Sequence, residues 1–443
     1  MMNQRVRGTE ASVLAALAAA TAIVLVVVAC GNGPRSATGA QVGPMLEVSR
    51  GCAGQNAEAE QAVDGAYVYV AWIGCGGIGF AWSADGGRSF SRPVTVPGSA
   101  GTGRYRSGLP RYGWDPAVAI GLGGTVYVCY MYERNGSVHP MVAKSTDHGR
   151  TFPLVSAVPP PRGHNWGDRD FIAVAADGAV YVTWDYGPSL TPRQANVVIQ
   201  RSVDGGRTWS GIIPVSPGYP SHGGGVAAPL LVEPDGRIDV LFWTLGGGGA
   251  RQPALPNGHD YFTSSANGGR SWTKPVAVQP GAGTIGNQVT WIDTALAVDA
   301  TGTLYATWDT QRPRRDIGWL SYSATHGASW SPALRVPTDH ISAEHIMAVA
   351  AGSPGTADVG WLSDSSGRGY ALYVRPFSVR RGWLSKPLRV SRLFGNPAAW
   401  PGDTIGIGVR RAGGGHARPR LLVSWGSAVS GQVSQIWFAQ VTM

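Results

Sequence analysis

Residues 202–209 read Ser202-Val203-Asp204-Gly205-Gly206-Arg207-Thr208-Trp209, the composition of a tight β-hairpin turn closed by an aromatic residue. The Asp204 carboxylate can accept hydrogen bonds from backbone N–H groups across the turn, and the glycine pair supplies the positive φ that the reversal needs. Trp209 can then reach the apolar layer beneath the turn. One such turn would be weak evidence for any fold, but this sequence contains five.

The five turns recur about every 60 residues, which indicates one supersecondary unit repeated along the chain. Asn267 and Thr325 replace the acid in the last two copies. The pattern resembles the Asp-box (BNR) repeat of the sialidase-like β-propellers, and this resemblance implies a propeller fold. The turns begin at Ser83, Ser145, Ser202, Ser265 and Ser323 and end at Phe90, Phe152, Trp209, Trp272 and Trp330.

A second marker, a short alternating strand that ends in an aromatic residue, lies between the boxes and occurs seven times. Each repeat therefore reads as four strands, and we predict an all-β, seven-bladed β-propeller of four-stranded antiparallel blades over residues 45–443. Six blades is the alternative, because the sixth box is lost at residues 378–383. The seven strands are 65–72, 124–130, 178–184, 236–243, 302–308, 355–361 and 420–425.

The N-terminal strand is predicted to close the ring. Residues 45–50 match residues 387–392 of an outer strand, whereas the seventh repeat ends without an outer strand of its own. Pairing the first strand with the last blade would remove an open sheet edge.

The N-terminus resembles a bacterial lipoprotein signal peptide. An uncharged apolar run, 11–29, follows Arg5 and Arg7, and Val27-Val28-Ala29-Cys30 is similar to a lipobox. We expect a signal peptide over 1–29, lipid (palmitate-type acyl chains) on Cys30, a flexible tether over 30–44 and the propeller over 45–443. An uncleaved membrane helix is the alternative, and both place the propeller on the extracytoplasmic face of the cell membrane.

That compartment permits disulfides, and Cys52 and Cys75 are the predicted pair because both fall on one face near the ring closure. Cys129 lies inside a strand and is expected to be a buried hydrophobe.

Composition excludes several classes of protein. The net charge of +9 is spread along the chain without a basic block, so no nucleic-acid partner is expected. No phosphate loop, nucleophile elbow or metal-ligand motif is present. We expect a monomer without a cofactor. The sequence leaves open whether a structural cation binds in the central channel.

Candidate site residues cluster at the face opposite the boxes, where the loops are long. Acidic residues or a histidine recur at the start of the inner strands, with Glu58 roughly equivalent, and an aromatic residue usually precedes them. Because the inner strands are arranged radially, these residues could form a polar ring at the central mouth that binds a ligand or performs acid–base chemistry. Alternatively, the acids cap turns and the tryptophans pack between blades. The catalytic candidates are Asp115, Asp170, Asp293, Asp403 and His345; the ligand-binding candidates are Trp114, Trp166, Asp168, Arg169, Trp291 and Trp400.

The family resemblance implies a specific test for sialidase activity. Sialidases of this fold use three arginines, a tyrosine nucleophile helped by a glutamate, and an aspartate. The first inner strand, 57–63, has no arginine, and no Arg-Ile-Pro motif occurs, so no arginine triad is carried over. The sequence therefore favours a lipid-anchored envelope propeller that binds a glycan or a protein partner. A sialidase-like glycoside hydrolase acting on an anionic glycan is the alternative, and an envelope scaffold is a third reading.

Overall fold

The computed structural model describes the chain from Ala40 to Met443, apart from several short segments. No helix in this described part of the chain is long and apolar enough to cross a membrane. The described residues are 40–104, 110–161, 163–187, 195–215, 225–244, 260–278, 294–312, 315–336, 346–363, 369–396, 398–410, 419–429 and 431–443.

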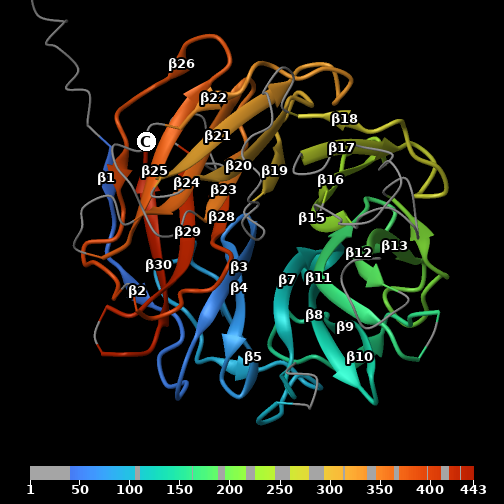
Figure 1. The fold of residues 1–443 in the computed structure, drawn as a ribbon. Coiled ribbons are helices and arrows are strands. Elements are labelled where there is room, and N and C mark those ends of the chain that lie inside the picture. The colour runs from blue at the N-terminus through green and yellow to red at the C-terminus, as the bar shows by residue number, and fades with distance from the viewer. Residues whose placement is uncertain are drawn as a thin grey trace, which may run out of the picture. The chain divides into compact units, whose positions relative to one another are not determined.

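Seven antiparallel sheets, each with four main strands, form a seven-bladed propeller, as the repeat count predicts (Figure 1). The inner strands are β3 (Ala57–Asp64), β7 (Trp114–Ile120), β11 (Trp166–Val174), β15 (Gly225–Val232), β19 (Ala295–Val298), β23 (Met347–Ala351) and β28 (Gly406–Arg410). The second strands are β4 (Tyr67–Gly74), β8 (Val126–Arg134), β12 (Val180–Gly187), β16 (Ile238–Thr244), β20 (Leu304–Arg312), β24 (Thr356–Ser363) and β29 (Arg420–Ser427).

The outer half of each blade is built in the same way from a long third strand and a short fourth strand. The third strands are β5 (Gly77–Ser83), β9 (Ser137–Ser145), β13 (Asn196–Ser202), β17 (Asp260–Ser265), β21 (Arg315–Ser323), β25 (Ala371–Ser378) and β30 (Gln435–Thr442). The outer strands are β6 (Val94–Thr95), β10 (Leu154–Ala157), β14 (Ile213–Pro214), β18 (Val276–Ala277), β22 (Leu334–Arg335), and the pair β26 (Gly382–Trp383) and β27 (Leu388–Arg389). A short 3₁₀ turn, η1 (Leu122–Gly124), joins β7 to β8.

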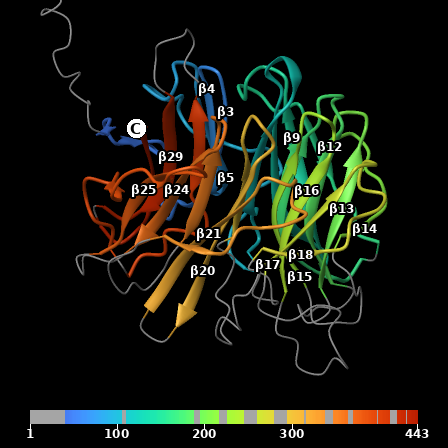
Figure 2. The same cartoon turned by 90° about the horizontal axis from the view of Figure 1, so that it is seen from above.

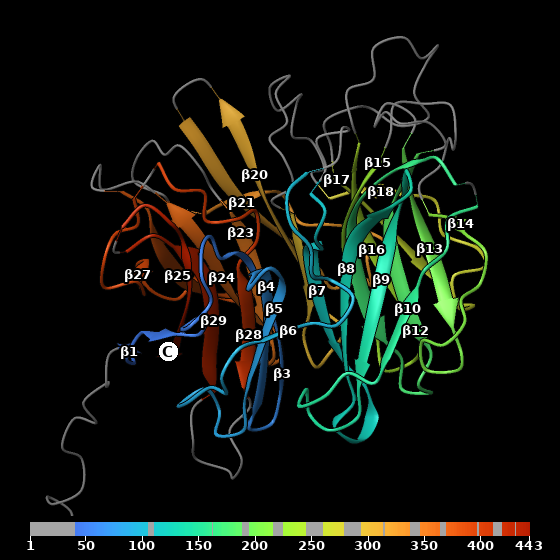
Figure 3. The same cartoon turned by 90° about the horizontal axis from the view of Figure 1, so that it is seen from below.

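The ring closes through the N-terminal strands, as the match between residues 45–50 and 387–392 predicts. Strand β2 (Leu46–Glu47) pairs with β30 through Leu46 and Phe438, and β1 (Gln41–Val42) pairs with the end of the same strand. Each inner strand contacts the next around the ring, including β28 with β3. The alternative of six blades is therefore wrong. Figure 3 shows β1 beside the C-terminus, and Figure 2 shows β20–β21 of the fifth blade between β24–β25 and β15–β18.

Each Asp-box holds its turn together through the acid and the serine. In the third box, the Ser202 hydroxyl donates to Asp204 Oδ1 at 2.7 Å and accepts from the Gly206 N–H at 2.8 Å. The Thr208 hydroxyl donates to Asp204 Oδ2 at 2.6 Å, and the Thr208 N–H donates to Oδ1 at 2.9 Å. These donors hold the pKa of Asp204 well below its usual range. Asn267 and Thr325 accept the equivalent N–H bonds in their boxes, so the turn survives loss of the acid.

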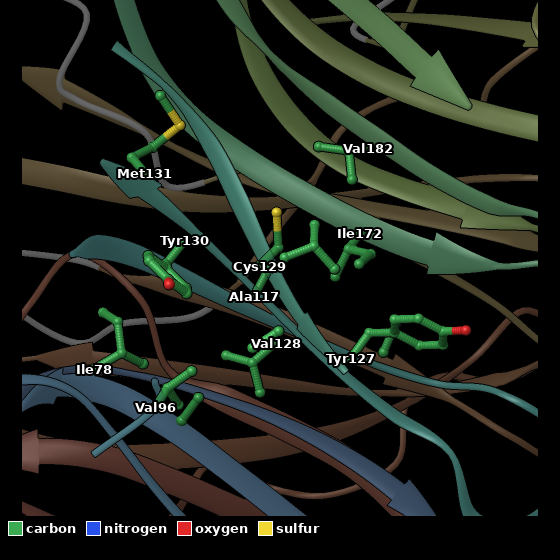
Figure 4. Packing of buried hydrophobic residues seen from close by; sticks show 14 of the residues in the cluster. Ile78, Val96, Ala117, Tyr127, Val128, Cys129, Tyr130, Met131, Ile172 and Val182 are labelled. Carbon is green, nitrogen blue, oxygen red and sulfur yellow. The ribbon is translucent and has the colours of Figure 1, made fainter. Parts of the chain in front are cut away.

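The blades pack through alternate faces of their strands, as the period-two pattern predicts. Figure 4 shows this for β8, where Val128 and Tyr130 lie toward Ile78 and Val96 of the preceding blade. Cys129 lies on the other side, toward the blade that follows. The aromatic markers at the ends of the second strands are largely core residues, and truncating one to alanine should cost about 3–5 kcal/mol. The fully buried tryptophans are Trp72, Trp184, Trp308, Trp361 and Trp425.

A disulfide joins Cys52 to Cys75, with their Cα atoms 4.7 Å apart. Cys52 follows the closing strand β2, and Cys75 lies in the turn between β4 and β5. The bond therefore ties the closing segment to the first blade. Cys129 is a free, buried thiol.

Candidate functional site

The starts of the inner strands lie at the opposite end of the blades from the boxes. In the third blade, Trp166 at the start of β11 pairs with Gly187 at the end of β12. Val174 at the other end of β11 pairs with Val180, which in turn pairs with Ser202 of the box. We call the end with the inner-strand starts the mouth face and the end with the boxes the box face.

Three consecutive inner strands carry the same backbone irregularity at the mouth face. The register of β3, β7 and β11 shifts after the first residues, and the first bulged residue of each has a positive φ. These residues are Glu58 (φ 56°), Asp115 (φ 49°) and Arg169 (φ 48°). A non-glycine side chain rarely adopts this conformation, and such strain is concentrated at functional sites. The three blades therefore aim a charged side chain from one equivalent position.

This register corrects the alignment of the polar ring. From the sequence pattern, Asp170 of the third blade is expected at the position that Asp115 occupies in the second blade. In the structure the two-residue bulge places Arg169 at that equivalent position instead. Asp170 occupies the next position, is almost completely buried, and lies against the Cys129 thiol. Burial raises the pKa values of Asp170 and Cys129 well above their usual ranges. Asp170 thus belongs to the packing between the second and third blades.

Arg169 contacts carboxylates from two other blades. Its backbone N–H donates to Asp115 Oδ2 at 3.1 Å, and its side-chain Nη2 forms an ion pair with Asp403 Oδ2 at 3.2 Å. The guanidinium is 5% exposed, whereas the Asp403 side chain is 35% exposed. The buried Arg169 therefore contacts two half-buried acids, Asp115 and Asp403, that come from different blades.

Proton sharing surrounds this arginine. Glu58 and Asp168 each share a side-chain hydrogen bond with Asp115. Burial, followed by the charge of Asp115, raises the pKa values of Glu58 and Asp168 well above the usual carboxyl range, although Arg169 opposes both shifts. Two carboxyl groups can share a hydrogen bond only when one carries a proton. Glu58, Asp115, Asp168, Arg169 and Asp403 form what we call the acid–arginine cluster.

The segment before β28 holds Asp403 against the first blade. The Glu58 N–H donates to the Pro401 carbonyl at 3.1 Å, and a Cβ added to Gly402 would lie 2.0 Å from the Glu58 nitrogen. Gly402 also has a φ of +101°, so glycine is required there twice over. The Trp400 indole N–H donates to Asp403 Oδ1 at 3.0 Å, and the Trp400 side chain stays exposed (43%). A fixed aromatic ring therefore flanks the reachable carboxylate.

A cavity of about 230 Å³ in the central channel adjoins the cluster. Arg169, Asp403, Glu60 and Gln61 supply its polar wall, and burial raises the pKa of Glu60 to about 8. The apolar wall comes from the inner strands β11, β15, β19 and β23 and from the segment that enters β28, and includes Phe171, Leu231, Leu296, Met347, Val349 and Ile405. No group of three or more His, Cys, Asp and Glu residues in the described ranges is arranged to hold a metal ion.

The structure brings together Asp115, Asp168, Arg169 and Asp403, with Trp400 beside them. Trp114 is buried and Trp166 is half-buried, and both lie in the bulged ends of inner strands. Asp293, His345, Trp291 and Cys30 lie outside the described residues. Sequence reasoning did not select Glu60 and Gln61 as site residues. The alternation Ala57-Glu58-Ala59-Glu60 was a signal for them, because acids at every second position are unusual in an inner strand.

No protein-family model matches the chain, and no curated protein matches it. Among solved structures, an ulvan lyase from a new family of polysaccharide lyases superposes with a TM-score of 0.60 at 12% identity, covering 89% of this chain and 95% of that one. The polysaccharide lyase Uly1 gives 0.51 at 10% identity, covering 86% and 89%. A Hadza microbial sialidase gives 0.48 at 13% identity, covering 85% and 76%. At these identities the matches show the fold alone.

Proposed function

We propose that this protein binds a glycan at the mouth face, as a propeller held on the extracytoplasmic side of the membrane through lipid on Cys30. The exposed ring of Trp400, fixed by its hydrogen bond to Asp403, carries this proposal. An aromatic face covers the apolar C–H side of a sugar ring, while an adjacent carboxylate accepts hydrogen bonds from its hydroxyl groups. The ulvan lyase and Uly1, which share the fold, act on polysaccharides according to their names, and this supports a glycan as the ligand.

The charges at the mouth favour a neutral or amine-bearing sugar over an acidic one. Arg169 is the one arginine among the described residues that line the channel cavity, and Asp403 already pairs with it. Glu58, Glu60, Asp115 and Asp168 surround it with further carboxyl groups. A substrate carboxylate would have to displace Asp403 from Arg169, and no second arginine among the described lining residues would compensate the displaced charge. A sialic acid or a uronic acid is therefore disfavoured.

A glycan array with the purified protein, followed by calorimetry on the ligands found, tests the proposal. We expect Trp400→Ala and Asp403→Asn each to weaken binding about tenfold or more, since each removes a central contact. Val203→Ala is the matched control, because Val203 is exposed on the box face and should leave affinity unchanged. Equal affinity of Trp400→Ala and wild type for the glycan would refute the proposal. Binding of a protein partner, with no glycan bound, would favour a protein ligand.

Hydrolysis of the bound glycan is the second candidate. Burial raises the pKa values of Glu58 and Asp168 well above the usual carboxyl range, which favours their protonated forms, while the half-buried Asp403 pairs with Arg169 at 3.2 Å. A protonated acid and an ionised partner are the two groups that glycosidases need. Release of reducing ends should fall as pH rises through the raised carboxyl pKa, and should fall at least a hundredfold in Asp403→Asn. Undiminished release by this variant would exclude Asp403 as the catalytic residue.

A further inference from the structure

The box face carries a ring of exposed arginines. Arg88, Arg150, Arg207 and Arg270 occupy the same position of the first four boxes, and all four are exposed. Arg150 and Arg207 donate to the carbonyls of their own box acids at 2.8 and 3.0 Å, which holds the guanidinium groups at the turn. The corresponding turn of the sixth blade, after Ser378, presents Arg380 and Arg381.

The first three boxes each carry a carboxylate beside their arginine, whereas the turn of Arg270 and the turn of Arg380 and Arg381 carry none. Asp85, Asp147 and Asp204 each accept several hydrogen bonds from their own turn. Other acids of this face, such as Asp64 and Asp177, lie in the turns between the first and second strands, nearer to the channel axis. Asp177 pairs with Arg201 at 3.6 Å. The uncompensated positive charge on the outer part of the face therefore comes from the turns of the fourth and sixth blades.

The described chain begins at this same face. Gln41 of β1 pairs with Thr442, Thr442 pairs with Arg420, and Arg420 pairs with Arg410 at the end of inner strand β28. Inner strands end at the box face, so the residues that lead back to Cys30 and to the apolar run 11–29 join the propeller there.

Three arginines, Arg88, Arg410 and Arg420, gather near this point of entry. Burial lowers the pKa of Arg410, and the neighbouring charges of Arg420 and Arg88 lower it further, whereas the charge of Asp85 raises it. Arg420 donates to Gln440 Oε1 at 2.7 Å, and no salt bridge within the described ranges involves Arg88, Arg410 or Arg420. Three arginines that share a single nearby carboxylate, Asp85, are stabilised by an external anion.

We propose that the box face lies on an anionic lipid bilayer, with the arginine ring against the lipid phosphates and the mouth face turned away from the membrane. The N-terminal segment holds the propeller at the membrane, whether through lipid on Cys30 or through the apolar run itself. The arginines then select one orientation, since each basic residue near an anionic surface strengthens the contact about fivefold. The inference goes beyond the proposed function, because it concerns the opposite face.

Two single-cysteine labels on opposite faces test the orientation. The full chain is reconstituted in vesicles of phosphatidylglycerol and phosphatidylcholine that contain a headgroup quencher. A thiol fluorophore is placed at Val203→Cys on the box face or at Val433→Cys in the loop between β29 and β30 on the mouth face. Both sites are exposed, whereas Cys52 and Cys75 are bonded and Cys129 is buried. Cys30 carries lipid in the acylated form, and in the form held by the apolar run it is replaced with serine so that only the introduced thiol reacts. The faces are separated by strands of about eight residues, roughly 26 Å.

We expect the label at position 203 to be quenched at least threefold more than the label at position 433. In 1 M salt, in vesicles of phosphatidylcholine alone, or in the combined variant Arg88→Gln, Arg207→Gln and Arg270→Gln, this ratio should fall toward one. Equal quenching of the two labels in the anionic vesicles would overturn the orientation. A ratio that stays unchanged in the uncharged vesicles and in the variant would overturn the role of the arginines.

Discussion

Replacing Arg169 with methionine should destabilise the propeller strongly and in a pH-dependent way. The substitution keeps a long unbranched side chain at the same positive φ, so backbone strain is matched. It removes the ion pair with Asp403 at 3.2 Å and the charge that opposes the raised pKa values of Glu58 and Asp168. Removing this buried guanidinium leaves the acids around it without a compensating charge.

Such a loss costs about 3–5 kcal/mol of unfolding free energy. Without Arg169 the folded-state pKa values of the neighbouring carboxyl groups rise further above their unfolded values. A carboxyl with a raised folded pKa stabilises the fold at low pH, and that contribution is lost as pH rises through the folded pKa. The cost of Arg169→Met should therefore be larger at pH 8 than at pH 5, by up to about 1.4 kcal/mol per pH unit for each carboxyl that titrates.

Urea unfolding followed by tryptophan fluorescence at pH 5 and pH 8 measures this difference. Arg201→Met is the matched control, because Arg201 pairs with Asp177 at 3.6 Å with side chains 28% and 65% exposed. An exposed pair of this kind contributes at most about 1 kcal/mol, with little change between the two pH values.

A loss below about 1 kcal/mol at pH 8, or an equal loss at both pH values, would refute the reasoning. The first result would mean that the cluster is solvated enough to lose its cation without cost. The second would mean that its carboxyl groups do not titrate with folding.

Three further predictions concern the same end of the molecule. The wild-type protein should lose stability between pH 5 and pH 8, because the pKa of Glu60 is raised to about 8 in the folded state. In Glu60→Gln the melting temperature should depend less on pH. An unchanged pH dependence in this variant would count against the prediction. The double variant Cys52→Ser and Cys75→Ser should lose about 3 kcal/mol, and reductant should lower the urea midpoint of wild type but not of the variant. Gly402→Ala should lower the free energy of unfolding by at least about 2 kcal/mol and weaken glycan binding. Gly54→Ala is the control, because it has open space around its Cβ and should cost only about 1 kcal/mol. Similar losses in the two variants would contradict the tight contact between Gly402 and Glu58.

The sequence was sufficient to predict the propeller, its seven blades and the closing strand. The boxes and the aromatic ends of the second strands repeat in every blade or nearly so, and such local signals do not depend on distant contacts. The match between residues 45–50 and 387–392 likewise identified β2 as the missing outer strand of the last blade. The disulfide followed from this closure, because it places Cys52 and Cys75 on one face.

The site was only partly predictable. Acids at the starts of the inner strands indicated the mouth, and Asp115, Asp168, Arg169 and Asp403 do meet there. Asp170 was misaligned, because the period-two pattern cannot show a two-residue bulge, and one extra residue turns a side chain from the mouth into the layer between blades.

By itself, then, the amino-acid pattern determined which turns and strands form and how many blades they make, since these depend on neighbours in the chain. Only the tertiary structure decided that Arg169 is paired with Asp403, 234 residues away, and that Glu58 lies against the Pro401 carbonyl. Closing the ring brings the first and last blades together, and the charge balance at the mouth depends on that contact. The choice of ligand class rests on the same balance, because an arginine that already has a carboxylate partner no longer offers its charge to an acidic sugar.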